Sequence, residues 1–310
     1  LAELLLTLVP ANRVFYVERS TKTWDFAGTP QAHYFATEGA AYFDRATGAE
    51  FLNFYGMRSA LDAQIFREVW GNDPRLKFVV QHQADWVGNE YDILVAPQWQ
   101  DAANPASPYY VPGCPLYVAP HTLFDVFTVH AQIDGGMAYG SAASLLETWR
   151  TTLTQTEAFN RIRDQMLTGP YHGVGDDGRR TVQLLTPKWQ HYRTVANTYG
   201  MELAAYEVGN HLNGVGGSSD LRAFMHLFSV SSQMGEVYTA TFAAIRAAGF
   251  DGPLCMSVEC RLPDDNIMHG LQRWLGDHNP AWTAVNAINL ANDGPTGRGS
   301  GDFVGLGEIA

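Results

Sequence analysis

The stretch Phe124-Asp-Val-Phe-Thr-Val-His130 decides the class of fold. It is a short, apolar run rich in β-branched and aromatic residues, and it ends in a polar side chain. Such a run is typical of a strand buried on both faces of a parallel sheet. Four more stretches have the same form, at residues 13–18, 76–81, 201–207 and 253–259. The sequence therefore predicts five buried parallel strands.

Helical periodicity fills the segments between these strands. Residues 51–70 place Phe54, Met57 and Leu61 on one face, at the spacing of an amphipathic helix. Similar patterns predict helices over residues 141–167 and 231–248, and one that begins at Pro187 and ends near Tyr199. Residues 87–120 and 168–186 are rich in Pro, Gly and Asp and are predicted to be long loops. Strands that alternate with helices indicate an α/β protein with right-handed crossovers.

Composition and charge exclude several classes of function. The 310 residues are 46% hydrophobic and carry a formal net charge of −12. An acidic chain with no cluster of Lys and Arg is a poor partner for nucleic acid or an anionic membrane. The apolar run 1–10 contains Glu3 and is too short to span a bilayer. We therefore expect neither a nucleic-acid nor a membrane partner.

Known cofactor and metal motifs do not occur in the sequence. No glycine-rich dinucleotide fingerprint or phosphate loop appears, and the ten histidines form no short-range pair with metal-ligand spacing. The residues that follow the first predicted strand, Arg19-Ser-Thr-Lys-Thr-Trp24, also lack a phosphate-binding pattern. The sequence thus predicts no cofactor and no metal, and it argues against a doubly wound nucleotide-binding sheet.

Polar side chains end each predicted strand: Glu18, His82, His130, Glu207 and Glu259. A (β/α)₈ barrel of the TIM type collects such residues at the carboxyl ends of its strands, where its active sites lie. We therefore expect a (β/α)₈ TIM-barrel fold.

The expected domain organisation is one barrel portion followed by a tail. No repeat or linker divides residues 1–288, and residues 289–310 form a glycine-rich C-terminal segment. The five predicted strands fall short of the eight that a closed barrel needs.

Two motifs carry a resemblance to a known family. Val14-Phe-Tyr-Val-Glu-Arg-Ser-Thr-Lys-Thr-Trp24 and Ala205-Tyr-Glu-Val-Gly-Asn-His-Leu212 resemble the fourth- and seventh-strand motifs of bacterial clan A glycoside hydrolases and their cellulose-binding relatives. Residues 54–71 and 234–238 resemble the helices after those strands. The resemblance implies barrel strands four to eight with long loops. Strands one to three would then come from a missing N-terminal segment or from a second chain. It also implies a secreted or periplasmic protein that binds an oligosaccharide or polysaccharide.

The resemblance assigns the catalytic positions. Retaining glycosidases use two carboxyl groups, one as nucleophile and one as general acid and base. Glu207 matches the nucleophile, whereas Lys22 stands where the family has its acid/base glutamate. The ordinary pKa of lysine, about 10.4, makes it a poor acid toward a glycosidic oxygen at neutral pH. We expect Glu207 and Lys22 to lie within ion-pair reach.

Three carboxylates are candidates to replace the lost acid/base residue: Glu259, Glu18 and Asp85. Glu259 is the best of them, because the strands that carry Glu207 and Glu259 would be neighbours in a barrel. The expected catalytic residues are therefore Glu207, Lys22 and Glu259.

The expected substrate-binding residues are the other polar and aromatic side chains near the strand ends. They are Glu18, Trp24, His82, Trp99, His130, Tyr206, Asn210 and His211. An indole face matches the apolar face of a pyranose, although tryptophan is more often a core residue and histidine is often buried. Trp99 lies in the polar stretch Ala96-Pro-Gln-Trp-Gln-Asp101, which favours a binding role.

Three functions remain open from the sequence. The first is a glycoside hydrolase-like protein of the retaining type that acts on a β-linked polysaccharide. The second is a non-catalytic carbohydrate-binding pseudoenzyme, which the loss of the acid/base residue favours. The third is a barrel used as a structural or assembly scaffold.

Overall fold

The computed structural model describes residues 1–26, 29–172, 180–256, 270–274 and 276–291. The chain divides into two compact units. The first unit comprises Leu1–Ala131, Pro187–Tyr206 and Ala248–Cys255. The second unit comprises Gln132–Thr186, Glu207–Ala247 and Met256–Ala310. Each unit is described by itself below.

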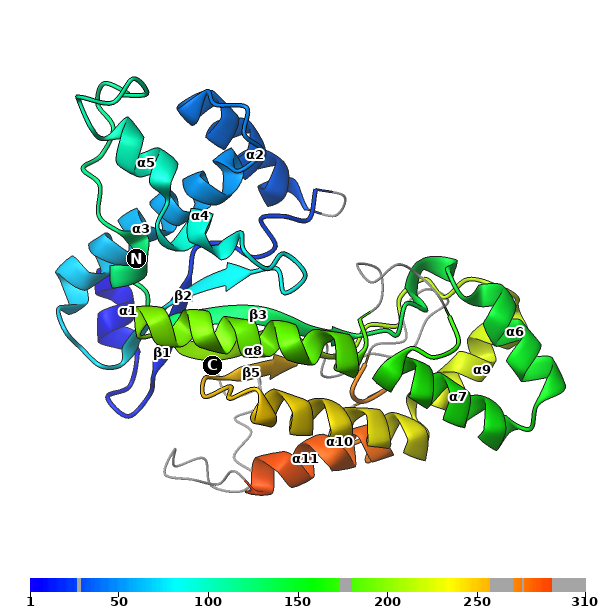
Figure 1. The fold of residues 1–310 in the computed structure, drawn as a ribbon. Helices are drawn as coiled ribbons and strands as arrows, with labels where there is room; N and C mark the ends of the chain where they lie inside the picture. The colour runs from blue at the N-terminus through cyan, green and yellow to red at the C-terminus, as the bar shows by residue number, and fades with distance from the viewer. Residues whose placement is uncertain (27–28, 173–179, 257–269, 275, 292–310) are drawn as a thin grey trace. The chain divides into compact units, whose positions relative to one another are not determined.

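A five-stranded, all-parallel sheet forms the centre of the fold, with its strands in the order of the chain. The strands are β1 (Phe15–Glu18), β2 (Leu76–His82), β3 (Val126–Ile133), β4 (Glu202–Asn210) and β5 (Leu254–Met256) (Figure 1). The register pairs Glu18 with Val79 and Val79 with Val126. All five predicted strands are confirmed, while residues 257–259 of the last prediction lie outside the described residues.

The expected (β/α)₈ TIM barrel is wrong. The sheet has five strands, and no further strand occurs in the described part of the chain, so β1 and β5 remain edges of a half-barrel sheet. Apolar runs and crossovers predict parallel strands locally, but closure needs an edge-to-edge pairing that these runs do not encode. The expectation of eight strands came from the polar residues at the strand ends and from the family resemblance, and neither determines how many strands are present.

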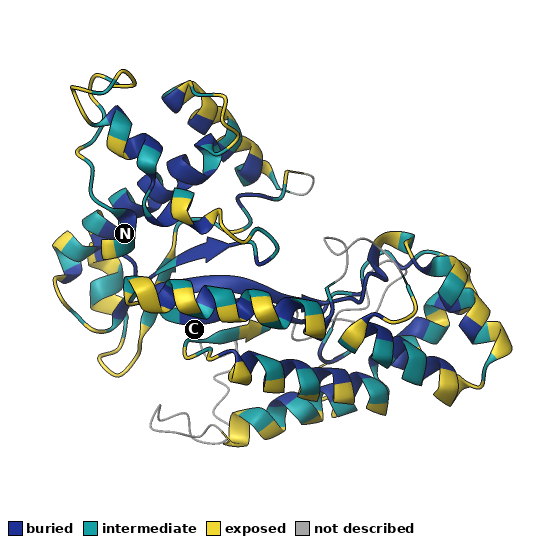
Figure 2. Cartoon of the chain, in the orientation of Figure 1, coloured by how far each residue is buried: buried dark blue, intermediate teal, exposed yellow. Residues whose placement is uncertain are grey.

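Helices of the first unit surround the sheet residues of that unit. They are α1 (Ala2–Leu8), α2 (Pro30–Phe43), α3 (Glu50–Trp70), α4 (Glu90–Leu94), α5 (Pro97–Ala102), the 3₁₀ turn η1 (Pro120–Thr122) and most of α8 (Val182–Tyr199). The α3 helix is the centre of this group, because it packs against α1, α2, α4, α5 and η1. Figure 2 shows buried positions in dark blue along α3, β2 and β3.

The α3 helix confirms the periodicity predicted over residues 51–70. Its Tyr55 is fully buried, and the Tyr55 hydroxyl accepts a hydrogen bond from the Gln81 backbone N–H of β2 (3.1 Å). Gly56 lies so close to α4 that a Cβ atom there would be 2.3 Å from the Ile93 carbonyl oxygen. Only glycine permits this approach of the two backbones.

Asp125 joins β2, β4 and α3 at the start of β3. Its carboxylate accepts hydrogen bonds from the Phe78 backbone N–H (2.7 Å) and the Arg67 guanidinium (2.9 Å). Its backbone N–H donates to the Phe78 carbonyl (2.9 Å), and its own carbonyl accepts from the Glu202 backbone N–H (2.9 Å). One residue therefore sets the register of three strands and anchors the helix beside them.

Two details of the first unit differ from the sequence prediction. The region 87–120 is not simply a loop, because it contains α4 and α5. The α8 helix begins at Val182 rather than at Pro187, which lies inside it. The Trp189 indole of α8 donates to the His130 carbonyl of β3 (3.3 Å), which holds the helix on the sheet.

The second unit consists of helices around the ends of β3 and β4. They are η2 (Ala138–Gly140), α6 (Ala143–Thr152), α7 (Gln155–Thr168), α9 (Ser219–Ser229), α10 (Ser232–Ala247) and α11 (Pro280–Ala291). The predicted helix over 231–248 is confirmed as α10, which packs against α7, α9 and α11. The predicted helix over 141–167 is two helices, because Thr154 and Glu157 form a capping box that starts α7. Residues 289–291 of the predicted tail belong to α11, and 292–310 lie outside the described residues.

We predict that Asp125→Ala lowers the free energy of unfolding by about 2–4 kcal/mol. The substitution leaves the Phe78 N–H without its acceptor and the Arg67 guanidinium without its carboxylate. Urea unfolding followed by circular dichroism measures this loss. The control is Asp101→Ala, which removes a half-exposed ion pair with Arg45 and is expected to cost less than about 1 kcal/mol. Equal costs for both variants would contradict the role of Asp125.

Candidate functional site

The sequence-predicted site residues are divided between the two units. Glu18, Lys22, Trp24, His82, Trp99, His130 and Tyr206 belong to the first unit, and Glu207, Asn210 and His211 belong to the second. Glu259 lies outside the described residues. Because Lys22 and Glu207 are in different units, their expected ion pair stays a prediction.

Gln81, at the carboxyl end of β2, organises the loop after β1. Its side-chain oxygen accepts hydrogen bonds from the Thr21 hydroxyl (3.1 Å) and the Lys22 backbone N–H (3.3 Å). The Lys22 carbonyl in turn accepts from the Asp25 N–H (3.0 Å) and the Thr29 hydroxyl (3.2 Å). These bonds hold Lys22 in the left-handed region, with φ of 51°. A non-glycine residue in this region marks a segment that its surroundings constrain.

Glu18 ends β1 next to the same glutamine. Neighbouring protein atoms desolvate its carboxyl group and raise its pKa to about 8, while a hydrogen bond from Gln81 opposes the rise. The residue also keeps an exposed side, because β1 is an edge strand. At neutral pH the protonated form of Glu18 is therefore favoured, and this form can donate a proton.

Trp24, His82, His130 and Tyr206 pack together as a buried aromatic layer. The Trp24 ring centroid lies 6.4 Å from that of His82 and 6.1 Å from that of Tyr206, and the His130 and Tyr206 centroids are 6.3 Å apart. The Tyr206 hydroxyl donates to the His82 carbonyl (3.1 Å). Burial lowers the pKa of His82 to about 4, so this ring is neutral at pH 7. These four side chains are therefore part of the buried core near the strand ends, and they are not part of an exposed surface.

Two carboxylates near this layer have partners on α8 that the sequence analysis missed. Asp85 accepts a hydrogen bond from the Lys188 ammonium of α8 (2.8 Å) and lies 3.5 Å from the His130 ring nitrogen Nε2. Glu90 lies 2.7 Å from the His191 ring nitrogen Nε2, also on α8. Asp85 was a sequence candidate, but no local signal pointed to Lys188 or His191, because they come from a helix far along the chain.

Glu207 has the most constrained environment of the predicted catalytic residues. It is half-buried in β4 and adopts a left-handed conformation with φ of 51°. Its Oε2 accepts a hydrogen bond from Gln132 Nε2 of β3 (2.8 Å). Gln132 Oε1 in turn accepts from the Arg180 guanidinium (3.1 Å). This chain of polar groups holds the carboxylate against β3, the strand next to its own. Gln132 could have been predicted as a site residue, because it follows His130 by two residues in β3 and alternate residues of a strand share a face. Nothing in the sequence indicated Arg180.

The residues after Glu207 are held by different parts of the second unit. Asn210 is buried, and both its backbone N–H and its side-chain amide donate to the Tyr238 hydroxyl (3.3 Å each). The His211 backbone N–H donates to the Ile133 carbonyl (2.8 Å). The His211 ring lies 6.4 Å from that of Tyr139, which is 71% exposed and also left-handed. Tyr139 is an aromatic surface beside a predicted site residue, and the sequence analysis did not select it.

Trp99 belongs to the core of the first unit. It is fully buried, and its indole N–H donates to the Pro115 carbonyl (3.0 Å). It presents no indole face to a ligand, because its side chain is enclosed in the core together with the neighbouring Gln98, and only Gln100 is exposed.

No significant match to this chain was found among protein family models, curated proteins or solved structures. Within the described residues, no group of His, Cys, Asp and Glu could hold a metal ion. No helix among them is long and apolar enough to cross a membrane. The function is therefore argued from the geometry of the side chains.

We predict that Glu18→Gln stabilises the protein increasingly as the pH rises from about 4.5 to about 8. In this interval the unfolded chain ionises Glu18 while the folded chain retains the proton, so the wild-type protein loses stability as the pH rises. Glutamine removes this dependence. Melting temperatures at about pH 5, 7 and 9 measure the difference between the two proteins.

Glu68→Gln is the control for this measurement, because Glu68 is an exposed carboxylate of α3. Its melting temperature is expected to differ from that of the wild type by a similar amount at each pH. A constant difference for Glu18→Gln as well would contradict the raised pKa.

Proposed function

We propose that this chain is a glycoside hydrolase-like, carbohydrate-active protein in which the Glu207 carboxylate is the nucleophile. The observation that carries the proposal is the conformation of Glu207. A left-handed glutamate inside a strand costs about 1–2 kcal/mol of backbone energy, and hydrogen bonding through Gln132 fixes its carboxylate. Such local strain is found where a side chain must be aimed for function. The ligand on this proposal is a β-linked oligosaccharide or polysaccharide, and the location is secreted or periplasmic.

The proposed chemistry begins with attack by a Glu207 oxygen on the anomeric carbon of a β-glycoside. A bond forms between that oxygen and the sugar, the bond to the leaving group breaks, and the leaving oxygen takes the electron pair. Water then hydrolyses the glycosyl-enzyme and regenerates the carboxylate. Gln132 is the positioning residue, because its side-chain amide donates a hydrogen bond to Oε2 of the Glu207 carboxylate and so fixes the orientation of the nucleophile.

Lys22 stands at the position where the family that the sequence resembles has its acid/base glutamate. With lysine in place of the acid/base glutamate, no carboxyl group at that position protonates the leaving oxygen. Loss of such help typically costs a factor of about 10² to 10⁴ in rate. Glycosides whose leaving group departs as a stable anion need no proton, so Glu207 should act on them faster than on a β-linked oligosaccharide.

We predict that the protein hydrolyses 2,4-dinitrophenyl β-glycosides and that phenyl β-glycosides react at least about 10²-fold more slowly. Azide should accelerate the release of dinitrophenol, because it attacks the glycosyl-enzyme without help from a general base. The product would be a glycosyl azide, which mass spectrometry identifies. Glu207→Gln should reduce turnover to the background rate.

The matched control is Glu202→Gln. Glu202 lies on the same strand and forms an ion pair with Lys77 (3.1 Å), and its replacement should leave the turnover unchanged. If Glu207→Gln retains full turnover, Glu207 is not the nucleophile. If the wild-type protein binds oligosaccharides but turns over no glycoside, it is a binding protein rather than an enzyme.

A further inference from the structure

A cavity of about 300 Å³ opens in the first unit, where the N-terminus of α3 meets the loop after β2. Its lining residues are Thr47, Gly48, Ala49, Phe51, Leu52, Trp86, Asn89 and Asp92. The C-terminus of α3 leads directly into β2, so the N-terminus of this helix lies toward the carboxyl edge of the sheet. In parallel α/β proteins, ligands bind at this edge.

We infer that this cavity is a binding site for a neutral sugar of one or two pyranose rings. The site consists of an aromatic wall, a polar wall and an apolar floor, all contributed by the first unit. Its volume falls at the lower end of the range of about 300–1,000 Å³ for small-molecule pockets.

The aromatic wall is formed by Trp86 and Phe51. Both side chains are half-buried, and their ring centroids lie 6.2 Å apart at an angle of 79°. Phe26 packs edge-on against Phe51 at 5.3 Å and supports it from behind. The floor is Leu52, which is 2% exposed. A half-buried indole in the wall of a pocket offers a flat apolar surface that the C–H groups of a pyranose can cover.

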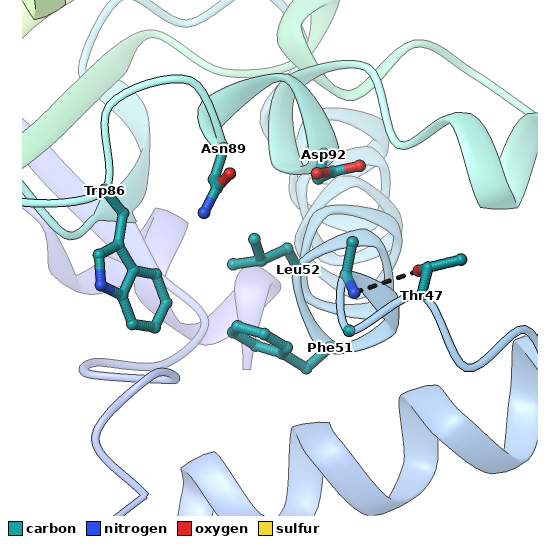
Figure 3. A pocket seen from close by; sticks show the side chains of 8 residues that line it. Thr47, Phe51, Leu52, Trp86, Asn89 and Asp92 are labelled. Carbon is teal, nitrogen blue, oxygen red and sulfur yellow. Dashed lines mark hydrogen bonds between the residues drawn. The ribbon is translucent and has the colours of Figure 1, made fainter.

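The polar wall is formed by Asn89 and Asp92, which Figure 3 shows along the upper rim of the pocket, with Trp86 at the left and Phe51 below. The exposed Asn89 amide can both donate to and accept from hydroxyl groups. One Asp92 oxygen accepts from Asn53 Nδ2 (3.1 Å), and Asn53 also accepts from the Gln98 N–H (2.9 Å). Asn53 therefore holds the Asp92 carboxylate in a fixed orientation.

The charges of the pocket select a neutral ligand. No Lys or Arg is among the lining residues, so an anionic phosphate or carboxylate would meet Asp92 without a counter-charge. A quaternary ammonium ion would need a cage of aromatic faces, whereas Trp86 and Phe51 are the two aromatic residues of the lining. Amide and carboxylate groups beside an indole match the mixed donor, acceptor and apolar surface of a sugar.

The loop between β2 and α4, which carries Trp86 and Asn89, is held in place by hydrogen bonds in the absence of a ligand. The Trp86 carbonyl accepts from the His82 ring nitrogen (3.1 Å) and from the Asn89 N–H (3.2 Å). The Glu90 carboxylate accepts from the Gly88 N–H (2.7 Å) and pairs with His191. A preformed site loses little conformational entropy on binding, which favours affinity for a small ligand.

The test is titration of the full chain with methyl β-glucopyranoside, methyl β-galactopyranoside and cellobiose, followed by tryptophan fluorescence and by saturation-transfer NMR. We expect saturable binding of at least one of these sugars. Trp86→Ala should weaken it at least tenfold, and Asn89→Ala, at an exposed position, should weaken it severalfold. Trp274→Ala is the matched control, since Trp274 is 50% exposed and does not line the pocket. This variant should bind like the wild type.

The outcomes separate this site from the proposed role of Glu207. Glu207→Gln should retain the Trp86-dependent binding in full, whether or not the wild-type protein turns over glycosides. Unchanged sugar affinity in both Trp86→Ala and Asn89→Ala would overturn the inference. So would the absence of sugar binding by the wild type, or Trp86-dependent binding of choline in place of sugars. Melting temperatures show whether the variants are folded.

Discussion

The structure of the first unit depends on the way in which Asp125 couples β2, β3, β4 and α3. Parallel strands have evenly spaced, slanted hydrogen bonds, so the register between them needs an additional constraint. Asp125 provides it, because its backbone pairs with Phe78 on one side and with Glu202 on the other, while its carboxylate binds Phe78 and Arg67. The carboxyl ends of the strands, where the polar residues lie, are aligned as a result. A shift of one residue would exchange the two faces of a strand and remove Gln81 from the loop after β1.

The sequence predicted the strands well and their closure badly. Each strand is an apolar run with a polar end, a signal that is complete within a few residues, and all five runs are strands in the structure. The barrel was inferred from the polar residues at the strand ends and from the motifs around Lys22 and Glu207, which say nothing about how many strands accompany them. Trp99 was predicted to bind a ligand for a similar reason. Its local sequence is polar, whereas the Pro115 carbonyl that accepts its indole hydrogen bond lies outside that stretch. Local patterns therefore predicted elements but not the contacts between distant segments.

The same limit applies to the candidate site. Glu18, His82 and His130 could be predicted from the ends of strands. The groups that decide their chemistry could not, because Lys188 comes from α8 and contacts the site through Asp85. The sequence analysis also assigned charges from residue type alone. In the structure the pKa of Glu18 is raised and that of His82 is lowered, so both side chains are mostly uncharged at neutral pH. The carboxyl edge of the sheet is thus less charged than its composition suggests.

Lys22, Tyr139 and Glu207 share a left-handed backbone without being glycine. At such positions a side chain costs stability that glycine would not, by about 1–2 kcal/mol for each residue. Stability and side-chain chemistry are therefore opposed at these three positions. A laboratory evolution experiment that rewards only heat resistance would favour glycine at each of them. The more heat-resistant descendants would keep the fold while losing the ammonium, phenol and carboxyl groups at these positions.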